Sequence, residues 1–166
     1  MRLPKSIVLL RHGRTAWNRA DTLIGQKDIP LDDGGRHDAR SAIRFLTGID
    51  AIYSSPLSRC KETAEIIGAA LGLEIVFLDG LKERHWGIYE GRPKRERDKY
   101  KDPEGGETID DFRARVEQEM LKIGNVRPLL VTHSGVIRLL LDRPNASIPH
   151  AVPLEMILEN VYSVKR

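Results

Sequence analysis

Residues 7–13 read IVLLRHG, an unbroken apolar run that ends in arginine, histidine and glycine. A second run of the same kind, LLVTHSG, occupies residues 129–135. Short continuous apolar runs are typical of strands that are buried on both faces of a sheet. In an open α/β sheet the ligand binds beyond the carboxyl ends of the strands. If these two strands are neighbours, His12 and His133 therefore lie in one crevice.

The rest of the chain alternates between strand-like and helix-like segments. Further strands are predicted at 51–53, at 74–78 and, along an edge of the sheet, at 156–164. Helices are predicted from Asp32 or Asp33 to about 47, from 55–58 to about 72, from Thr108 to 123 and over 135–141. This order predicts an α/β fold in one domain over residues 1–166. The expected architecture is a three-layer α/β/α sandwich with a mainly parallel sheet and helices on both faces.

Two long segments are predicted as irregular because glycine, proline and charged residues punctuate them. Residues 14–31 are expected to form a long loop, and residues 87–107 a loop or a poorly ordered flap. In the helix that follows, Phe112, Val116 and Leu121 are predicted to face inward.

Composition and charge exclude several classes of protein. Of the 166 residues, 40% are hydrophobic and 31% are charged, which excludes a disordered chain. The formal net charge of +3 is too small to indicate nucleic-acid binding. The single cysteine, Cys60, excludes an internal disulfide framework and fits a reducing compartment. The apolar run at the N-terminus is too short for a signal peptide or a membrane span, so a cytoplasmic protein without a membrane partner is expected.

The residues around the two histidines suit phosphoryl transfer. A neutral imidazole at His12 can attack phosphorus if its other ring nitrogen holds the proton and donates it to a backbone carbonyl. Arg11 and Arg59 would neutralise the charge on the phosphoryl oxygens, and His133 would add a further donor. This set can transfer a phosphoryl group without a metal ion.

A carboxylic acid is also needed, because the leaving oxygen has to be protonated. Glu83 is the first choice, and Glu90 and Glu107 are the acidic alternatives. A carboxyl group beside a phosphate dianion holds its proton more tightly, which keeps it able to donate. The sequence has no Walker-type glycine loop, no histidine or cysteine pair at metal-binding spacing and no serine-hydrolase elbow. Neither a metal ion nor another cofactor is therefore expected.

The same segments resemble the histidine phosphatase superfamily, also called phosphoglycerate mutase-like. The resemblance runs in the family's order through LRHGRTAWN (10–18), GQ (25–26), SSPLSR (54–59), LKE (81–83), WGIYEG (86–91), PEGGET (103–108) and VTHSG (131–135). It implies the phosphoglycerate mutase-like fold and a phosphohistidine at His12. It further implies site roles for the matching residues: a phosphate pocket of Arg11, Asn18, Arg59 and His133, with Glu83 as the acid and Gln26 touching the substrate.

Two departures from the family bear on activity. Ser134 stands where many members have a second glycine, and a serine there is compatible with a phosphatase and adds a donor to the phosphate site. The chain is also shorter than the mutases, whose extra loops and tail shield the phosphoenzyme from water. Hydrolysis is therefore expected to outpace mutase transfer. The expected partner is a small phosphate ester: a sugar phosphate, a phosphoglycerate or α-ribazole phosphate.

Three other functions stay open: a mutase of the same fold, a protein phosphatase acting on phosphohistidine, and a binding module with an inactive site. An intact Glu83 counts against the second, and retention of both histidines and both arginines counts against the third. The oligomeric state cannot be read from the sequence.

Several residues have a structural interpretation beside the functional one. His37, His85 and His150 lack partners at a useful spacing and are predicted to be structural or exposed, while Cys60 is predicted to pack. Asn18 could instead cap a turn. The basic residues between 92 and 101 form either a solvated face or a cationic flap over a multiply charged substrate.

Overall fold

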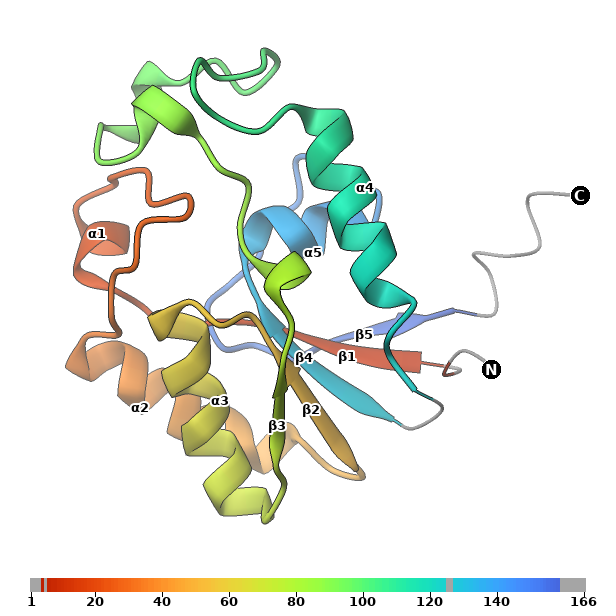
Figure 1. Cartoon of the computed structure of the whole chain (residues 1–166). Helices are drawn as coiled ribbons and strands as arrows, with labels where there is room; N and C mark the ends of the chain where they lie inside the picture. Colours follow the sequence, from red (N-terminus) through yellow and green to blue (C-terminus); the bar gives the residue numbers. More distant parts are fainter. Residues whose placement is uncertain (1–3, 5, 125–126, 159–166) are drawn as a thin grey trace, which may run out of the picture.

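Five strands form one sheet at the centre of the molecule (Figure 1). The structure, a computed structural model, describes residues 4, 6–124 and 127–158. The strands are β1 (Ser6–Arg11), β2 (Ala51–Ser54), β3 (Ile75–Phe77), β4 (Pro128–Thr132) and β5 (Leu154–Ile157). Their order in the sheet is β3-β2-β4-β1-β5. All pairs are parallel except β1 with β5, so the predicted mainly parallel sheet is confirmed.

The two strands that lead into the histidines are neighbours, as the sequence analysis required. β1 lies beside β4 in parallel register, with Leu9 opposite Leu130 and Arg11 opposite Thr132. Every residue of β4 is buried, which matches its uninterrupted apolar sequence. Because parallel strands share one carboxyl edge, the residues that follow Arg11 and Thr132 emerge side by side.

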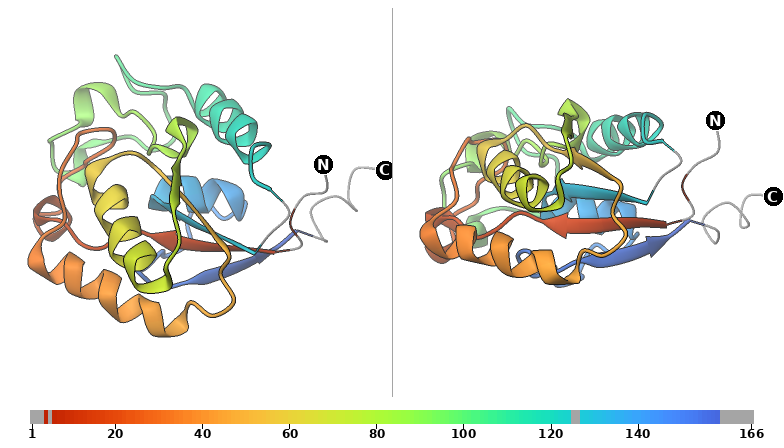
Figure 2. Two further views of the ribbon diagram at one scale, coloured as in Figure 1. Left: turned by 60° about the horizontal axis from the view of Figure 1, so that its bottom comes forward. Right: turned by 90° about the horizontal axis from the view of Figure 1, so that it is seen from below.

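Helices pack on both faces of this sheet (Figures 1 and 2). They are α2 (Asp33–Ala42), α3 (Ser58–Leu71), α4 (Ile109–Met120) and α5 (Ser134–Leu140), whereas the one-turn helix α1 (Ala16–Arg19) buries no residue and lies apart from the sheet. Val8 and Leu10 join one core cluster with residues of α2 and α3, whereas Ile7 and Leu9 join a second cluster with residues of α4 and α5. Successive side chains of a strand point to opposite faces, so β1 contributes to both cores. The predicted three-layer arrangement is confirmed.

Capping residues explain where the helices begin and end. Asp32, one of the two predicted caps, accepts a hydrogen bond from the Gly35 amide at 2.7 Å and so starts α2. A 3-10 turn, η1 (Ile43–Phe45), follows, and the α-helix therefore ends before the predicted residue 47. α3 ends before Gly72, whose φ of 67° lies in the left-handed region that glycine adopts without steric cost.

Three sequence predictions need correction. Residues 14–31 are not all loop, because Thr15 and Asn18 form a capping box that starts the short helix α1. The inward orientation predicted for Leu121 is wrong, since α4 ends at Met120 and Leu121 is 61% exposed. The edge strand β5 begins at Leu154 rather than at 156, and the predicted residues 159–164 lie outside the described residues.

The segment 87–107 is a loop, but it is tied down rather than poorly ordered. It contains two 3-10 turns, η3 (Gly87–Tyr89) and η4 (Lys94–Glu96), and follows a third, η2 (Asp79–Leu81). Its middle is hydrogen-bonded to the loop after α1, because the Leu23 amide donates to the Arg92 carbonyl oxygen and the Gly91 amide to the Leu23 carbonyl oxygen, both at 2.8 Å. In Figure 1 these two loops lie side by side beyond the carboxyl ends of the parallel strands.

Candidate active site

The carboxyl ends of β1 and β4 bring the two predicted histidines together. The His12 amide donates to the Thr132 carbonyl oxygen at 3.0 Å, which extends the strand pairing by one residue. The ring centroids of His12 and His133 lie 5.3 Å apart. Both residues are buried, with exposed fractions of 3% and 1%. The two histidines therefore share one site although 120 residues of sequence separate them.

The His12 ring has one nitrogen in the form that a nucleophile needs. Its Nδ1 lies 2.7 Å from the Gly13 carbonyl oxygen, which only accepts, so Nδ1 carries the proton and Nε2 the lone pair. Burial, followed by the charge of Arg59, lowers the pKa of His12 well below its ordinary value. The ring is consequently neutral at neutral pH, which is the state that can attack phosphorus.

Two arginines close to this ring each have a buried N–H donor that makes no hydrogen bond to any residue that the structure describes. Arg59, 1% exposed, donates from its terminal nitrogens to the carbonyl oxygens of Lys27 and Gly25 at 2.8 and 2.7 Å. Arg11 donates from Nη1 to the Ile148 carbonyl oxygen at 2.8 Å. Among the described residues, the buried Nε of both arginines has no hydrogen-bond acceptor. Burial lowers the pKa of both side chains, that of Arg11 to about 10, and the guanidinium groups stay charged at neutral pH. Spare N–H groups on fixed cations suit phosphate oxygens.

His133 is held by a hydroxyl and a thiol. Its Nε2 lies 2.9 Å from the Ser55 Oγ and 3.4 Å from the Cys60 Sγ. Burial lowers the pKa of His133 well below its ordinary value, so this ring is neutral as well. Burial also raises the pKa of the Cys60 thiol to about 12, which leaves Cys60 protonated and unsuited to act as a nucleophile.

Glu83 reaches the crevice from the segment that follows η2. Its Oε1 accepts from the Arg84 amide at 2.9 Å, and its Oε2 accepts from the Gly135 amide at 3.0 Å. A Cβ atom at residue 135 would overlap the Glu83 carboxylate, so any residue other than glycine there would displace that carboxylate. The carboxyl group is therefore fixed against the start of α5.

The two acidic alternatives to Glu83 are engaged elsewhere. Glu90 has a side chain that is 4% exposed, and its Oε1 accepts from the amides of Gln26 and Trp86 at 2.8 and 2.9 Å. Glu107 forms a two-pronged ion pair with Arg115 at 2.7 and 2.8 Å. The geometry therefore favours Glu83 as the acid.

The three remaining predicted residues differ in their access to the ligand. Asn18 and Ser134 line the cavity that opens above His12. Asn18 also caps α1, because its Oδ1 accepts from the Thr15 amide at 3.0 Å. Gln26 instead donates from Nε2 to the Glu83 carbonyl oxygen at 3.0 Å, which places it beneath the acid. Contact of any of these three with a substrate stays a prediction.

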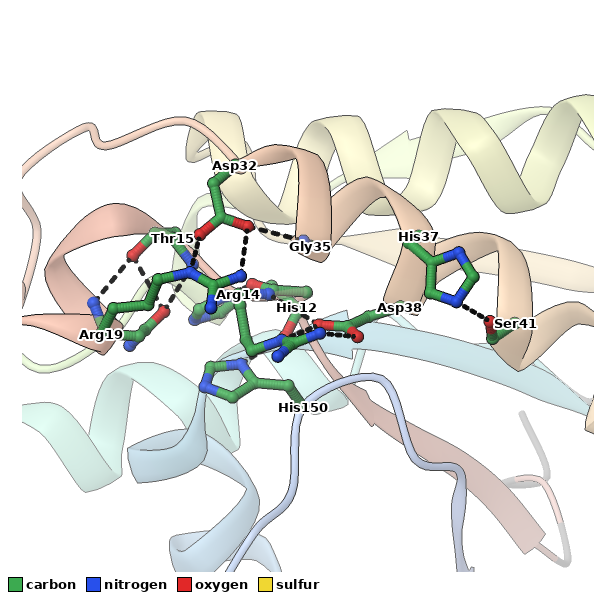
Figure 3. A network of polar contacts seen from close by, with 12 residues as sticks. His12, Arg14, Thr15, Arg19, Asp32, Gly35, His37, Asp38, Ser41 and His150 are labelled. Atoms are coloured by element: carbon green, nitrogen blue, oxygen red, sulfur yellow. Dashed lines mark hydrogen bonds and ion pairs between the residues drawn. The ribbon is translucent and has the colours of Figure 1, made fainter.

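His150 belongs to the site although the sequence analysis assigned it no role. Its Nδ1 donates to the His12 carbonyl oxygen at 2.9 Å, and its ring centroid lies 5.4 Å from that of His12. The Ala151 amide donates to the Arg11 carbonyl oxygen at 2.9 Å, and Ile148 accepts from the Arg11 side chain. Residues 148–151 thus form a strap along the main chain of residues 11 and 12, with the His150 ring beside it (Figure 3). Burial lowers the pKa of His150 to about 4.

The turn after His12 is braced against the start of α2 (Figure 3). Arg14 donates to the Asp38 carboxylate from Nε and Nη2, both at 2.7 Å. Gly13 and Gly35 pack so closely that a Cβ atom on Gly13 would overlap the Gly35 carbonyl oxygen. This close approach explains why glycine follows the histidine, and it fixes the Gly13 carbonyl group that accepts the hydrogen bond from His12 Nδ1.

These groups open into a cavity of about 550 Å³, a size typical of small-molecule sites. Its floor consists of Arg11, His12, Arg59 and Glu83, and its rim of cavity-lining residues between 84 and 113 and on α5. Nine lining side chains are cations and three are carboxylates, although the whole chain carries a net charge of only +3. Positive charge is therefore concentrated here, and the cavity suits an anionic ligand that is larger than phosphate alone.

Among the described residues, no group of three or more His, Cys, Asp and Glu side chains is arranged to hold a metal ion. None of the helices in this part of the chain has the length and apolar character needed to cross a membrane.

Known proteins show the same combination of sequence and fold. The family model described as histidine phosphatase superfamily (branch 1) matches residues 7–161. "Uncharacterized phosphatase PhoE" of Bacillus subtilis is 37% identical over 87% of this chain and 79% of that protein. "Phosphoglycerate mutase-like protein 4" of Arabidopsis thaliana is 36% identical over 96% of this chain and 78% of that protein. The crystal structure of TTHB049 from Thermus thermophilus has 28% identity and a TM-score of 0.81, covering 93% and 94% of the two chains. With its phosphoglycerate mutase-like α/β fold, the chain belongs to branch 1 of the histidine phosphatase superfamily.

Proposed function

We propose that this chain is a metal-independent phosphatase that hydrolyses a small phosphomonoester through a phosphohistidine at His12. The observation that carries the proposal is the state of the His12 ring: it is neutral, with Nδ1 bonded to the Gly13 carbonyl oxygen and Nε2 left as the lone-pair nitrogen. Guanidinium groups with spare donors flank that ring. A neutral nucleophile among fixed cations is the arrangement that phosphoryl transfer to nitrogen needs.

The reaction then proceeds in two balanced steps. In the first, the His12 Nε2 lone pair forms a bond to phosphorus while the bond from phosphorus to the leaving oxygen breaks. Glu83 gives its proton to that oxygen, and an alcohol leaves. In the second, a water oxygen bonds to phosphorus, the N–P bond breaks and its electron pair returns to Nε2. Glu83 takes the proton from the water, so inorganic phosphate is released and the starting state of both side chains is restored.

Arg11, Arg59 and His133 serve this reaction by holding the three phosphoryl oxygens. The Nε donors of the arginines have no competing acceptor among the described residues, so they are free to bind an oxygen. These donors are already in place before the substrate arrives, which reduces the reorganisation that the transition state requires. The candidate substrates are sugar phosphates, phosphoglycerates and α-ribazole phosphate.

Phosphoglycerate mutase activity is the main alternative, because similar bacterial proteins are named as probable phosphoglycerate mutases. A mutase returns the phosphoryl group from His12 to a second position of the same compound, whereas a phosphatase gives it to water. Phosphorus NMR with 3-phosphoglycerate separates the two: phosphate release faster than formation of 2-phosphoglycerate is expected. A phosphohistidine-containing peptide tests the protein phosphatase alternative in the same way.

Trapping the intermediate tests the proposal directly. A brief reaction with a radiolabelled phosphomonoester, stopped in alkali, is expected to leave a base-stable, acid-labile label on the peptide that contains His12. His12→Asn is expected to carry no label and to lower kcat/KM by about 10⁴-fold or more, since the nucleophile is gone. Activity after treatment with a chelator is expected to be unchanged. A label on any other residue, or turnover by His12→Asn at the wild-type rate, would contradict the assignment.

A further inference from the structure

The rim of the cavity holds more positive charge than the phosphate site requires. Three of its cations are paired with carboxylates: Arg84 with Asp102, Lys94 with Asp21, and Lys101 with Asp98. These pairs are the usual state of surface charges and need no ligand. Lys99 and Arg113 also line the cavity but are exposed, so the half-buried cations of the rim are the ones to explain.

Arg97 and Arg138 are half-buried cavity-lining cations without an ion pair to any described residue. Arg97 lies over the Trp86 ring, with 4.6 Å between its guanidinium carbon and the ring centroid. Arg138 donates from Nε to the Ala146 carbonyl oxygen at 2.8 Å, which leaves the terminal nitrogens of its guanidinium. Both side chains are therefore held by neutral contacts, through an aromatic ring in one case and a main-chain carbonyl in the other.

The charges of these two arginines act on each other and on the floor of the cavity. Burial lowers the pKa of Arg97, the charge of Glu83 opposes that effect, and the charge of Arg138 reinforces it. Arg138 likewise lowers the pKa of Arg11. Arg97 and Arg138 line one cavity, together with Glu83 and Arg11 of its floor, so these charges act within a shared volume. Two half-buried cations that line one cavity repel each other, and an anion bound between them would offset that repulsion.

We propose that Arg97 and Arg138 bind a second anionic group on the substrate, a carboxylate or a second phosphate carried by the leaving group. This inference rests on the proposed function, because it assigns the first phosphate to His12. Glu83 protonates the leaving oxygen, so the leaving group must extend from Glu83 toward the rim, where these guanidinium groups lie. Their planar forks match the oxygens of a carboxylate or a phosphate. The preferred substrate is thus a compact phosphomonoester with a second anionic group rather than a neutral sugar or nucleoside phosphate.

Paired substrates test the inference. 3-Phosphoglycerate and glycerol 3-phosphate differ by a carboxylate in place of a hydroxymethyl group. Propane-1,3-diol bisphosphate and its monophosphate differ by the second phosphate. For the wild-type chain, the compound that carries the second anionic group is expected to have a higher kcat/KM than the compound that lacks it. The expected difference is about tenfold or more in at least one pair, which is the usual effect of a charged hydrogen bond. The pair that shows the preference identifies the anion as a carboxylate or a phosphate.

Substitutions then assign the preference to these side chains. Arg97→Gln and Arg138→Gln are each expected to reduce the ratio of kcat/KM values toward one. Arg95→Gln is the matched control, because Arg95 lies in η4 two residues before Arg97, is exposed and does not line the cavity, yet its loss removes the same charge. Its ratio is expected to stay at the wild-type value. A partly unfolded variant lowers both values of a pair and leaves their ratio unchanged, so misfolding does not imitate the effect.

Two results would overturn the inference and can be told apart. Phosphate release at equal kcat/KM within both pairs, or a ratio that survives in Arg97→Gln and Arg138→Gln, would refute the anion subsite while the phosphatase assignment stands. Absence of phosphate release from all four compounds would refute the proposed function, and this inference with it.

Discussion

The floor and the rim of the cavity are built in different ways. On the floor, His12 and Arg59 are 3% and 1% exposed, and main-chain carbonyls fix their orientation. On the rim, Arg97 and Arg138 are half-buried, and Tyr100 is 82% exposed. The floor is anchored to the central strands, whereas most of the rim is loop. Under the proposed function, we therefore expect the floor to perform the chemistry common to all phosphomonoesters and the rim to discriminate between leaving groups.

Replacing a floor cation should cause the largest loss and should affect all substrates alike. Arg59→Lys is expected to lower kcat/KM by about 10²–10³-fold, because an ammonium cannot bind the carbonyl oxygens of Gly25 and Lys27 and still present a donor to the phosphate. Steady-state kinetics on the four compounds above would show a common factor. A decrease in kcat/KM for only one compound would contradict the proposal that the floor acts on all substrates alike.

Glu83 lies where the two regions meet, so the effect of replacing it should depend on the leaving group. Glu83→Gln is expected to lower kcat/KM by about 10²-fold for an alkyl phosphate, whose leaving oxygen needs a proton. With p-nitrophenyl phosphate the loss is expected to be below about tenfold, because p-nitrophenolate leaves without one. kcat/KM is the proper measure, since it reports the steps up to phosphohistidine formation. Equal losses on both substrates would argue against Glu83 as the acid.

The strap of residues 148–151 should have a smaller effect on the rate, because it only positions the main chain at His12. An Asn amide nitrogen lies where Nδ1 of histidine lies, whereas that of Gln lies one bond farther out. His150→Asn is therefore expected to keep the bond to the His12 carbonyl oxygen and near-normal activity. His150→Gln is expected to form phosphohistidine about fivefold more slowly, the usual effect of one lost neutral hydrogen bond. Rapid-quench measurement of phosphohistidine formation distinguishes the two variants. Equal rates in both would show that His150 only fills space.

The effect with the least bearing on turnover concerns stability rather than catalysis. The pKa of His150 is about 4 in the folded chain and near 6.5 when unfolded, so between these pH values only the unfolded chain binds its proton. Stability that is present above pH 6.5 is therefore lost as the pH falls toward 4. Urea unfolding at several pH values is expected to show about one proton fewer taken up on unfolding of His150→Asn than of the wild type. An unchanged pH slope would mean that His150 is not buried in its neutral form.

The sequence predicted the floor far better than the rim or the strap. Arg11, His12 and His133 follow buried strands, and the apolar runs before them predict both the strands and their shared edge. His150 follows no strand and contacts His12 through a main-chain carbonyl oxygen 138 residues away in sequence. No pattern of side chains encodes such a contact. Leu121 was misplaced because its apolar character continues the helical period past Met120, where the helix has already ended.

The rim was difficult to predict for a different reason. Its basic residues alternate with acidic ones, a pattern that is typical of a solvated surface. Only the folded chain shows that Lys94 and Lys101 are paired and that Arg97 instead turns onto Trp86. Which charges are free depends on partners such as Asp21, far away in the sequence.

The contact between Gly135 and Glu83 has a consequence for how this protein can vary. Residue 134 faces the cavity and tolerates a side chain, as its serine shows, whereas a methyl group at 135 would collide with the carboxylate next to it. A library randomised at both codons and selected for turnover would therefore recover varied residues at the first position and glycine at the second. We therefore expect substitutions at 134 to alter substrate preference without displacing the Glu83 carboxylate, because the two adjacent positions are under separate constraints.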